Sequence, residues 1–556
     1  MKSAVAQLVE CFDRGLGDPH DPLQIFSFAR CQELDEREEF PTEICQRLDG
    51  LGLARRYVPA ALGGELHSYE ELAALVRLVA RRDLTVAVAH VGTFLGAASV
   101  WLAGRPEQAA QLAREVEAGS VVSLALSERE HGSDLLANRV RTSGGEDWYR
   151  IAGEKWLIGN ASRGQLVCVL ARTEPVGGPR GFSLLLVDKR RLAPGSYRCL
   201  PAVRTVGIRG ADISGIEFRE AEVPADALVG AAGTGLETVL KCLQLTRTLC
   251  GALSLGTADH ALRLAVRNSA TGANPALAGA YADLLVAEAV TLVAARAVHA
   301  LPGELSVASA AVKAFVPTLV EELIADLARE LGPALLLAEP TEADSFQKLE
   351  RDHHIMSIFD GNTAVNLNAL VNQFDALARG YRRARVDQAG LAAATTLSDP
   401  LPAADTSRLA LFSRHGSSLV QSLPAALAEL TDPHFAPLAA ALAEQAEQLH
   451  TEMAELRPSA REVPAMAYEL ARRYTVLFAA AGCVQLWLHN RTADDSPFWQ
   501  HGDWLRAALI RLLGQLGAGS GELPADLVAE LTERLRHQHK AGRLFSLLDC
   551  QLEESA

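Results

Sequence analysis

The stretch "VVSLALSEREHGSD", residues 121–134, marks the point at which the pattern of the chain changes. Ahead of it, alanine and leucine recur at helical spacing in "EELAALVRLVARRD" and "PEQAAQLAREVEAG". From Val121 to about Gly230 the sequence instead shows short apolar runs bounded by turn residues, which predict β-strands. Beyond Gly230 the helical spacing returns. The order of helices, strands and helices predicts an α+β protein that is mostly α.

These patterns also predict the domain organisation. Long amphipathic segments after the strands are typical of a C-terminal four-helix bundle. Two prolines and little regular pattern in "VDQAGLAAATTLSDPLPAADTSR" favour a linker, and further helical segments follow it. The expected parts are an N-terminal helical domain (1–120), a central β-barrel-like domain of about six or seven strands (121–232), the bundle (233–386), the linker (387–407) and an additional C-terminal helical domain (408–556).

Charge and cysteine usage exclude several classes of function. The chain has 53 basic and 68 acidic residues, a net charge of −15, which repels nucleic acid and anionic membranes. Its nine cysteines are scattered from Cys11 to Cys550 without a C-x-x-C pair. This spacing fits reduced, mostly buried thiols better than a disulfide framework or a zinc site. We therefore expect neither a nucleic-acid partner nor a bound metal.

We expect a cytoplasmic protein without a membrane span. The apolar segment "LLVAEAVTLVAARAV" is broken by Glu288 and Arg296, whereas a spanning helix needs about 20 consecutive apolar residues. The amino terminus "MKSAVAQLVECFDRG" reaches Glu10 and Asp13 too early for a secretory signal peptide.

A second stretch, "HHIMSIFDGNTAVNLNAL" (353–370), places Asp360 among apolar residues. Two interpretations are open on local grounds. Asp360 caps a helix that begins near Asn362, or it is a general base whose pKa is raised by apolar neighbours. Arg247 lies in the apolar helical stretch "CLQLTRTL". If buried it needs a partner, for which Asp360 is one candidate; otherwise it is a solvent-facing helix arginine.

Five motifs, in order between about residues 35 and 385, resemble the acyl-CoA dehydrogenases. They are "VPAALGGE", "SLALSEREHGSD", "GEKWLIGNAS", "GIRGADISGIEFREAEVPADALVG" with the helix entry "AGTGLETVLKCLQLTR", and "FQKLERDHHIMSIFDGNT". Any one of them is weak, and the second taken alone favours an ordinary hairpin turn with a capped end. The helical region after residue 408 is similar in architecture to the extra domain of longer members, the very-long-chain enzymes and the acyl-CoA oxidases.

The resemblance implies bound FAD and an acyl thioester substrate. In that family a glutamate removes the α-proton while flavin N5 takes the β-hydride, and Asp360 stands at the position of this glutamate. Arg247 and Gly361 would contact substrate. The expected FAD contacts are Leu124, Leu126, Ser127, Gly132, Ser133, Trp156, Leu157, Ile158, Gly159, Arg267, Asn362 and Thr363.

The chain departs from the family pattern at several of these places. The base is an aspartate, one methylene shorter than glutamate, so substrate or backbone must come closer to it. Gly159 replaces a threonine, which leaves only backbone for a flavin contact there. In the runs that hold the adenosine end of FAD, only Arg267 and Gly332 survive, and Arg329 stands at a glutamine position.

The leading hypothesis is therefore a flavin-dependent α,β-dehydrogenase of specialised metabolism. Its substrate would be a thioester on CoA or on a carrier protein, and an electron-accepting flavoprotein or oxygen would reoxidise the flavin. The family favours a homodimer or homotetramer. The alternatives are an oxidase or oxygenase, similar to nitroalkane oxidase or to the acyl-CoA oxidases, and a catalytically degenerate acyl-binding partner protein.

Overall fold

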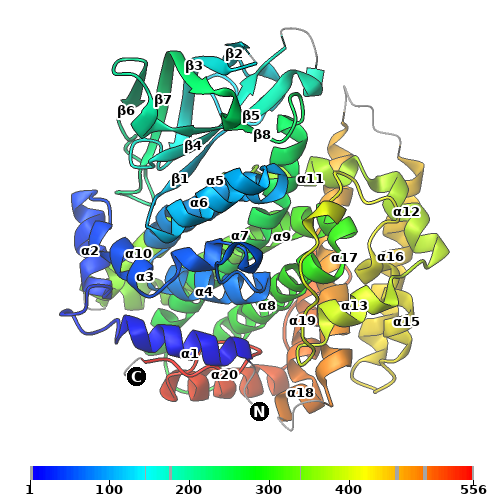
Figure 1. Ribbon diagram of the computed structural model, residues 1–556. Helices are drawn as coiled ribbons and strands as arrows, with labels where there is room; N and C mark the ends of the chain where they lie inside the picture. Colours follow the sequence, from blue (N-terminus) through cyan, green and yellow to red (C-terminus); the bar gives the residue numbers. More distant parts are fainter. Residues whose placement is uncertain are drawn as a thin grey trace. The chain divides into compact units, whose positions relative to one another are not determined.

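A computed structural model describes residues 4–144, 146–174, 178–337, 340–456, 463–492 and 497–553 (Figure 1). The chain forms two compact units, and each unit combines segments that are separated in the sequence. The first unit comprises Met1–Phe28, Ser68–Arg82 and Arg247–Ala556. The second comprises Ala29–His67 and Asp83–Thr246. Each unit is described by itself below.

The second unit contains a mixed eight-stranded sheet. Its strands pair in the order β6-β7-β3-β2-β4-β5-β8, and β1 pairs in parallel with β4. The sequence predicts fewer strands because β2, β6 and β8 have only four, four and two residues, too short to show an alternating pattern. The bounds are β1 Val122–Ala125, β2 Arg141–Gly144, β3 Trp148–Gly159, β4 Leu166–Arg172, β5 Phe182–Asp188, β6 Tyr197–Leu200, β7 Ile213–Pro224 and β8 Leu228–Val229.

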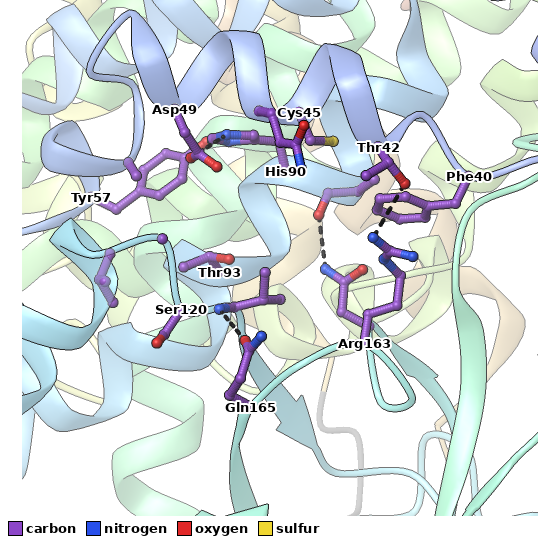
Figure 2. A pocket seen from close by; sticks show the side chains of 17 residues that line it. Phe40, Thr42, Cys45, Asp49, Tyr57, His90, Thr93, Ser120, Arg163 and Gln165 are labelled. Carbon is purple, nitrogen blue, oxygen red and sulfur yellow. Dashed lines mark hydrogen bonds and ion pairs between the residues drawn. The ribbon is translucent and has the colours of Figure 1, made fainter. Parts of the chain in front are cut away.

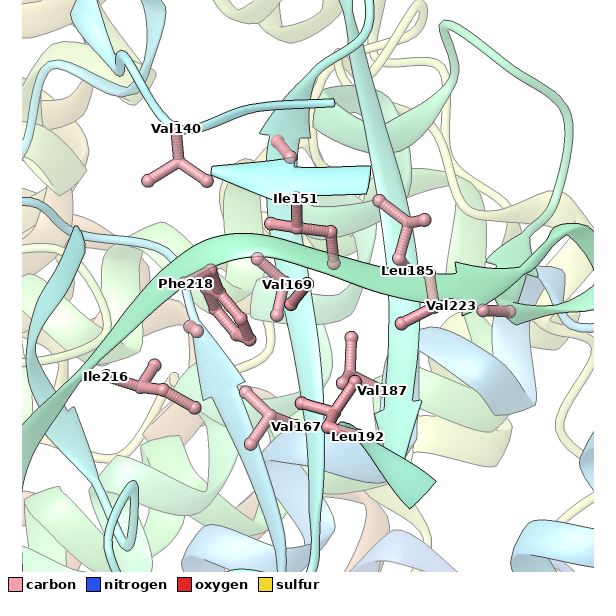
Figure 3. Close-up of a cluster of buried hydrophobic side chains, with 14 of the residues drawn as sticks. Val140, Ile151, Val167, Val169, Leu185, Val187, Leu192, Ile216, Phe218 and Val223 are labelled. Atoms are coloured by element: carbon pink, nitrogen blue, oxygen red, sulfur yellow. The ribbon is translucent and has the colours of Figure 1, made fainter. Parts of the chain in front are cut away.

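One apolar cluster joins the two halves of this sheet (Figure 3). Ile151 of β3 and Phe218 of β7 meet Val169 of β4 and Leu185 of β5 within it. Because β3 pairs with β7 and β4 pairs with β5, the sheet must curl so that both halves face the same core. This arrangement accounts for the barrel-like character that the sequence predicts.

Helices complete the second unit. They are most of α2 (Phe28–Arg37), α3 (Thr42–Gly50), α5 (Leu84–Ala103), α6 (Pro106–Glu117) and the start of α7 (Gly235–Arg267). Helix α5 lies directly against β1, since a Cβ at Gly96 would stand 2.5 Å from the Val122 carbonyl oxygen. A residue without a side chain is needed for this close approach.

The first unit is helical and has α8 (Pro275–Ala300) at its centre. Helix α8 contacts α4, α9, α13, α17, α19 and α20, and it is buried along nearly its whole length. The helices of this unit are α1 Ala4–Leu16, α4 Tyr69–Arg82, the rest of α7, α8, α9 Leu305–Leu337, α10 Pro340–His353, α11 Thr363–Val371, α12 Phe374–Arg383, α13 Gln388–Thr395, α14 Ser418–Gln421, α15 Leu423–Ala428, α16 Ala436–Glu455, α17 Ala465–Asn490, α18 Pro497–His501, α19 Asp503–Gln515 and α20 Ala525–Lys540.

Part of the expected linker is an ordered helix. Residues 388–395 form α13, with Leu391 and Ala394 buried. The Asp387 carboxylate accepts a hydrogen bond from the Gly390 amide and caps the helix. The prediction of a linker is therefore wrong for this part. The two prolines, Pro400 and Pro402, lie after the helix ends.

In the part of the chain that the structure describes, two helices, α5 and α8, are long and apolar enough by length and composition to cross a membrane. Within the protein, 61% of the apolar window of α5 and 89% of that of α8 are buried. The apolar run of α5 contains no Asp, Glu, Lys or Arg and is a second candidate beside the α8 segment. Helices that are apolar on all sides are also typical of the core of a large protein.

Buried charges attach the segment after α20 to the first unit. Glu288 of α8 accepts hydrogen bonds from the Arg77 guanidinium (2.5 Å) and from the Leu547 amide (2.6 Å). Arg77 also donates to the Phe545 carbonyl at 2.7 Å. The side chains of Arg77 and Glu288 are 7% and 1% exposed, so each depends on the other for its compensation.

Replacing Glu288 with alanine should release this segment. The substitution leaves Arg77 buried without its carboxylate, which costs about 3–5 kcal/mol of unfolding free energy. Urea denaturation measures the loss, and limited proteolysis should then cut within residues 544–553. Glu429→Ala is the control, since Glu429 forms only an exposed ion pair with Arg491 and its loss should cost less than about 1 kcal/mol. Equal losses in both variants would contradict this account.

Candidate functional site

Asp360 lies in a loop of unusual backbone conformation between two helical segments of the first unit. The 3-10 segment His354–Ser357 precedes it, and α11 begins at Thr363. The φ angles of Asp360 and Gly361 are 55° and 83°. A left-handed conformation is uncommon for a residue other than glycine, and such strain gathers at functional sites where neighbours enforce it.

Arg247 of α7 is one of these neighbours. Its side chain is buried, and its Nε donates a hydrogen bond of 2.9 Å to the main-chain carbonyl of Asp360. The partner of Arg247 is thus Asp360, as one of the predictions has it, through a hydrogen bond to the backbone and the charge of the carboxylate. A Cβ at Gly361 would stand 2.8 Å from Arg247 Nη2, so both this contact and the φ angle require glycine there.

Lys313 of α9 is a second neighbour, and the sequence analysis did not identify it. Its side chain is fully buried, and its ammonium group donates to the Met356 carbonyl at the end of the 3-10 segment. It lies 5.5 Å from the centre of the Phe359 ring. Burial lowers the pKa of Lys313, while Cys250 and Asp360 act to raise it. A lone lysine in "AAVKAF" gives no sequence signal for this role.

Cys250 contacts the Asp360 carboxylate directly. Its Sγ lies 3.9 Å from Oδ2 of Asp360, one helical turn after Arg247. Burial raises the pKa of this thiol to about 12, with Asp360 contributing in the same direction. The thiol therefore stays protonated near neutral pH and acts as a weak hydrogen-bond donor to the carboxylate.

One local expectation for Asp360 is wrong, and another holds only in part. The cap of α11 is Asn362, whose Oδ1 accepts from the Val365 amide at 2.9 Å, so Asp360 does not cap this helix. The apolar surroundings are also less complete than the sequence implies, because Ile358 is 61% exposed and Asp360 itself is half-buried. In a tight turn, side chains that are neighbours in the sequence can point to solvent. A run of apolar residues in the sequence does not show this change of direction.

The predicted flavin turn lies in the second unit, where β1 and β3 approach each other. Ser127 Oγ donates to the Trp156 carbonyl at 3.0 Å, and the Trp156 amide donates to the Ser127 carbonyl at 3.1 Å. Leu124 is buried in β1. Gly132 and Ser133 are exposed at the tip of the turn, which leaves their backbone amides accessible.

The segment Trp156–Gly159 partly fulfils its expected role as an apolar wall. Leu157 is 45% exposed and has a φ angle of 58°, at a register shift between β3 and β7. Gly159 is exposed, and a Cβ placed there would touch nothing within 4 Å. Ile158 instead points into the sheet core, so its side chain does not belong to the wall. Bulges of this kind re-aim side chains next to active sites.

A buried ion pair, which the sequence analysis also missed, shapes the same turn. Lys155 is fully buried and donates to the Leu126 carbonyl (2.8 Å) and to Glu128 (3.0 Å). Glu128 also accepts from the amides of Arg139 (2.7 Å) and Val140 (3.0 Å). Burial lowers the pKa of Lys155 to about 8, opposed by Glu128. Burial acts to raise the pKa of Glu128, but Lys155 and the two amides lower it overall.

The other expected FAD residues belong to the first unit. Arg267, at the end of α7, contacts the His20 ring nitrogen at 2.9 Å. Burial and Arg267 together lower the pKa of His20 to about 4. Asn362 uses its side-chain oxygen as the helix cap, which leaves its amide group and the partly exposed Thr363 for other contacts. Arg329 pairs with Asp326 within its own helix.

The residues of the second unit fit a flavin. An exposed apolar Leu157 beside Trp156 offers a surface for a planar ring, while the open backbone at Gly132 and Gly159 permits close approach. Ser133 adds an exposed hydroxyl and an amide suited to polar groups of the cofactor. These residues would hold the ring and the pyrophosphate, which the sequence resemblance also implies.

The Glu128–Lys155 pair should be needed for this turn. Glu128→Gln leaves a buried ammonium without its counter-charge, so unfolding free energy should fall by about 3 kcal/mol, and less flavin should copurify. Glu130→Gln is the matched control, because Glu130 forms only an exposed pair with Arg139. Urea denaturation and the flavin-to-protein absorbance ratio measure the two effects. If Glu128→Gln retained both stability and flavin, the pair would have no such role.

Comparison with known proteins gives the same assignment along most of the chain. The N-terminal, middle and C-terminal domains of the acyl-CoA dehydrogenases match residues 28–120, 123–221 and 233–374. "Probable acyl-CoA dehydrogenase FadE25" of Mycobacterium tuberculosis is 29% identical over 348 residues, which are 60% of this chain and 87% of the relative.

Two solved structures show the same fold. An acyl-CoA dehydrogenase from Bacillus anthracis, complexed with FAD, is 17% identical, covers 96% of this chain and 90% of its own, and has a TM-score of 0.66. The prolyl acyl carrier protein oxidase AnaB is 16% identical, covers 67% of this chain and 99% of its own, and has a TM-score of 0.59. The first of these similarities extends over the helices that follow the three matched domains. The chain belongs to the acyl-CoA dehydrogenase family of FAD-dependent oxidoreductases that act on the CH–CH group of acyl thioesters, in a longer form with additional C-terminal helices.

Proposed function

We propose that this protein dehydrogenates an acyl thioester between its α and β carbons and that Asp360 is the base. The observation that carries the proposal is a half-buried aspartate in left-handed backbone whose carbonyl is held by Arg247. The next residue, Gly361, has no room for a side chain beside Arg247. A base must be held within hydrogen-bond reach of the proton that it removes. The hydrogen bond from Arg247 to the Asp360 carbonyl provides such a fixed position.

In this mechanism the Asp360 carboxylate takes the α-proton, and the β-hydrogen leaves with its electron pair to give the α,β-unsaturated thioester. FAD, when bound, supplies the acceptor for that hydride. Lys313 and Arg247 place positive charge near Asp360, which favours the ionised carboxylate that can accept a proton. The Cys250 thiol donates to Oδ2 and orients the carboxylate. Ser127, Trp156 and Leu157 of the second unit would hold the flavin ring.

The same proposal includes the carrier of the thioester and the acceptor of the electrons. The likeness to a carrier-protein oxidase supports a carrier-bound thioester beside CoA as a substrate. Reoxidation would be by an electron-accepting flavoprotein or by oxygen. We further propose a cytoplasmic homodimer or homotetramer, following the habit of the family, in specialised metabolism.

Asp360→Asn tests the base. The amide has nearly the same size as the carboxylate, so flavin should remain bound. Because the amide cannot accept the α-proton, the anaerobic loss of flavin absorbance after addition of an acyl thioester should slow at least ~100-fold. Asp375→Asn, on the exposed side of α12, is the control and should react normally. Acyl-CoA and acyl carrier protein thioesters are to be compared. Peroxide release in air would indicate an oxidase, and an Asp360→Asn variant as fast as the parent would refute the role of Asp360.

Lys313→Met tests how the loop that carries Asp360 is positioned. Methionine fills a similar volume without the charge or the bond to the Met356 carbonyl, so the anaerobic reduction rate should fall about tenfold, by ~1.4 kcal/mol. Because a nearby cation favours the ionised base, its loss should move the acid limb of the pH–rate profile to higher pH. Lys241→Met is the control, since Lys241 pairs with Glu237 on the surface of α7. A slower variant with an unchanged pH profile would mean a structural role only.

A further inference from the structure

A pocket of about 230 Å³ lies entirely within the second unit (Figure 2). It is enclosed by α3, α5, the 3-10 segment Ala54–Tyr57, the start of β1 and the turn between β3 and β4. None of the residues that we expect at the flavin or at the substrate lines it. The mechanism proposed above does not use it.

One wall of the pocket is a chain of three hydrogen-bonded side chains. Tyr57 Oη lies 2.6 Å from His90 Nδ1, and His90 Nε2 lies 3.1 Å from Asp49 Oδ1. Burial raises the pKa of Tyr57 well above its usual value, so the phenol keeps its proton and donates it to Nδ1. With Nδ1 accepting from the phenol, Nε2 carries a ring proton and points it to Asp49. The chain fixes the Asp49 carboxylate at the pocket mouth, where it is 39% exposed.

A threonine hydroxyl on α5 also lines the pocket. Thr93 of α5 is only 7% exposed, and its hydroxyl has no hydrogen bond to any described residue. A threonine in a helix usually donates to the carbonyl four residues earlier, but the Ala89 carbonyl accepts from the Asn160 side chain instead, at 2.8 Å. Figure 2 shows Thr93 among the residues that line the pocket, and it lies one helical turn after His90 on α5. Its hydroxyl is available to hydrogen-bond an occupant of the pocket.

The opposite end of the pocket carries an arginine without a carboxylate partner. The Arg163 guanidinium lies 3.7 Å from the centre of the Phe40 ring and donates to Thr42 Oγ1 at 3.3 Å. Other surface arginines of the same unit, such as Arg198 and Arg204, pair with glutamates. Among the described residues Arg163 pairs with none. Stacked on an aromatic ring, it presents a fixed fork that matches a carboxylate.

The Cys45 thiol does not make the pocket a nucleophilic site. Burial raises its pKa to about 12, with Asp49 contributing in the same direction, so the thiol stays protonated and unreactive. The pocket therefore offers binding groups rather than a reacting group. Among these groups are the Asp49 carboxylate, the Arg163 guanidinium and the Thr93 hydroxyl.

We propose that this pocket binds a small zwitterion of the α-amino acid class. Its carboxylate would pair with Arg163, its ammonium group with Asp49, and a side-chain or backbone polar group with Thr93. The volume is below the roughly 300–1,000 Å³ typical of drug-sized ligands, which restricts the occupant to a few heavy atoms. A simple anion would meet the Asp49 carboxylate, and a simple cation would meet Arg163, so charge of both signs is required.

The test is calorimetric titration of the full-length, flavin-loaded protein with three probes of similar size, L-serine, propionate and propylammonium. L-Serine should bind, and the other two should bind at least tenfold more weakly. Asp49→Asn keeps the acceptor for His90 and Arg163→Gln keeps the donor to Thr42, so both variants should fold while each weakens L-serine binding at least tenfold. Thr93→Val should weaken it by a smaller factor.

Asp360→Asn is the control variant and should bind L-serine as the parent protein does. Failure of L-serine to bind, binding that is indifferent to both charge substitutions, or equal binding of propionate would each overturn the proposal. Because the readout is binding at residues outside the proposed reaction, failure of the dehydrogenase assignment leaves this result unaffected.

Discussion

The site depends on keeping one aspartate in a backbone conformation that it would not adopt alone. Asp360 has a φ angle of 55°, and left-handed backbone costs a residue with a side chain about 1–3 kcal/mol. Arg247 and Lys313 offset this cost from α7 and α9, two long helices of the first unit, by binding the carbonyls of Asp360 and Met356. Both cations are buried, and water cannot replace the carbonyl that each of them binds.

Buried charge serves a related purpose elsewhere in the first unit. Asp259 binds Arg263 at 2.7 Å and the Phe545 amide at 2.9 Å, while Glu288 binds Arg77 and the Leu547 amide. Both carboxylates thus connect the inner helices to the segment after α20. Apolar packing between alanine-rich helices allows sliding, whereas a carboxylate matched to specific donors fixes one register. In this chain, the amides of Phe545 and Leu547 close this arrangement.

The sequence predicted the fold through patterns that are local. The strands of six or more residues, the helix periodicities and the order of the motifs were all visible, and the family assignment is confirmed. Lys313 and Lys155 were not predicted because each acts on a carbonyl distant in sequence, Met356 and Leu126. A buried lysine in an apolar helix or strand has no pattern that distinguishes it from a surface one. Ile358 was misjudged for the converse reason, since an apolar residue in a strained turn can face solvent.

The replacement of glutamate by aspartate has a physical consequence at this loop. Arg247 holds the carbonyl of Asp360, and the single methylene then leaves the carboxylate only two bonds from a fixed main chain. The carboxylate stays beside Cys250, whose protonated thiol is 3.9 Å from Oδ2, and has few rotamers in which to move. A longer glutamate could reach further but would lose more rotamer freedom when ordered. The shorter side chain holds the carboxylate more firmly but extends less far from the backbone. Contacts elsewhere on the substrate must therefore bring the α-carbon of the thioester to the loop.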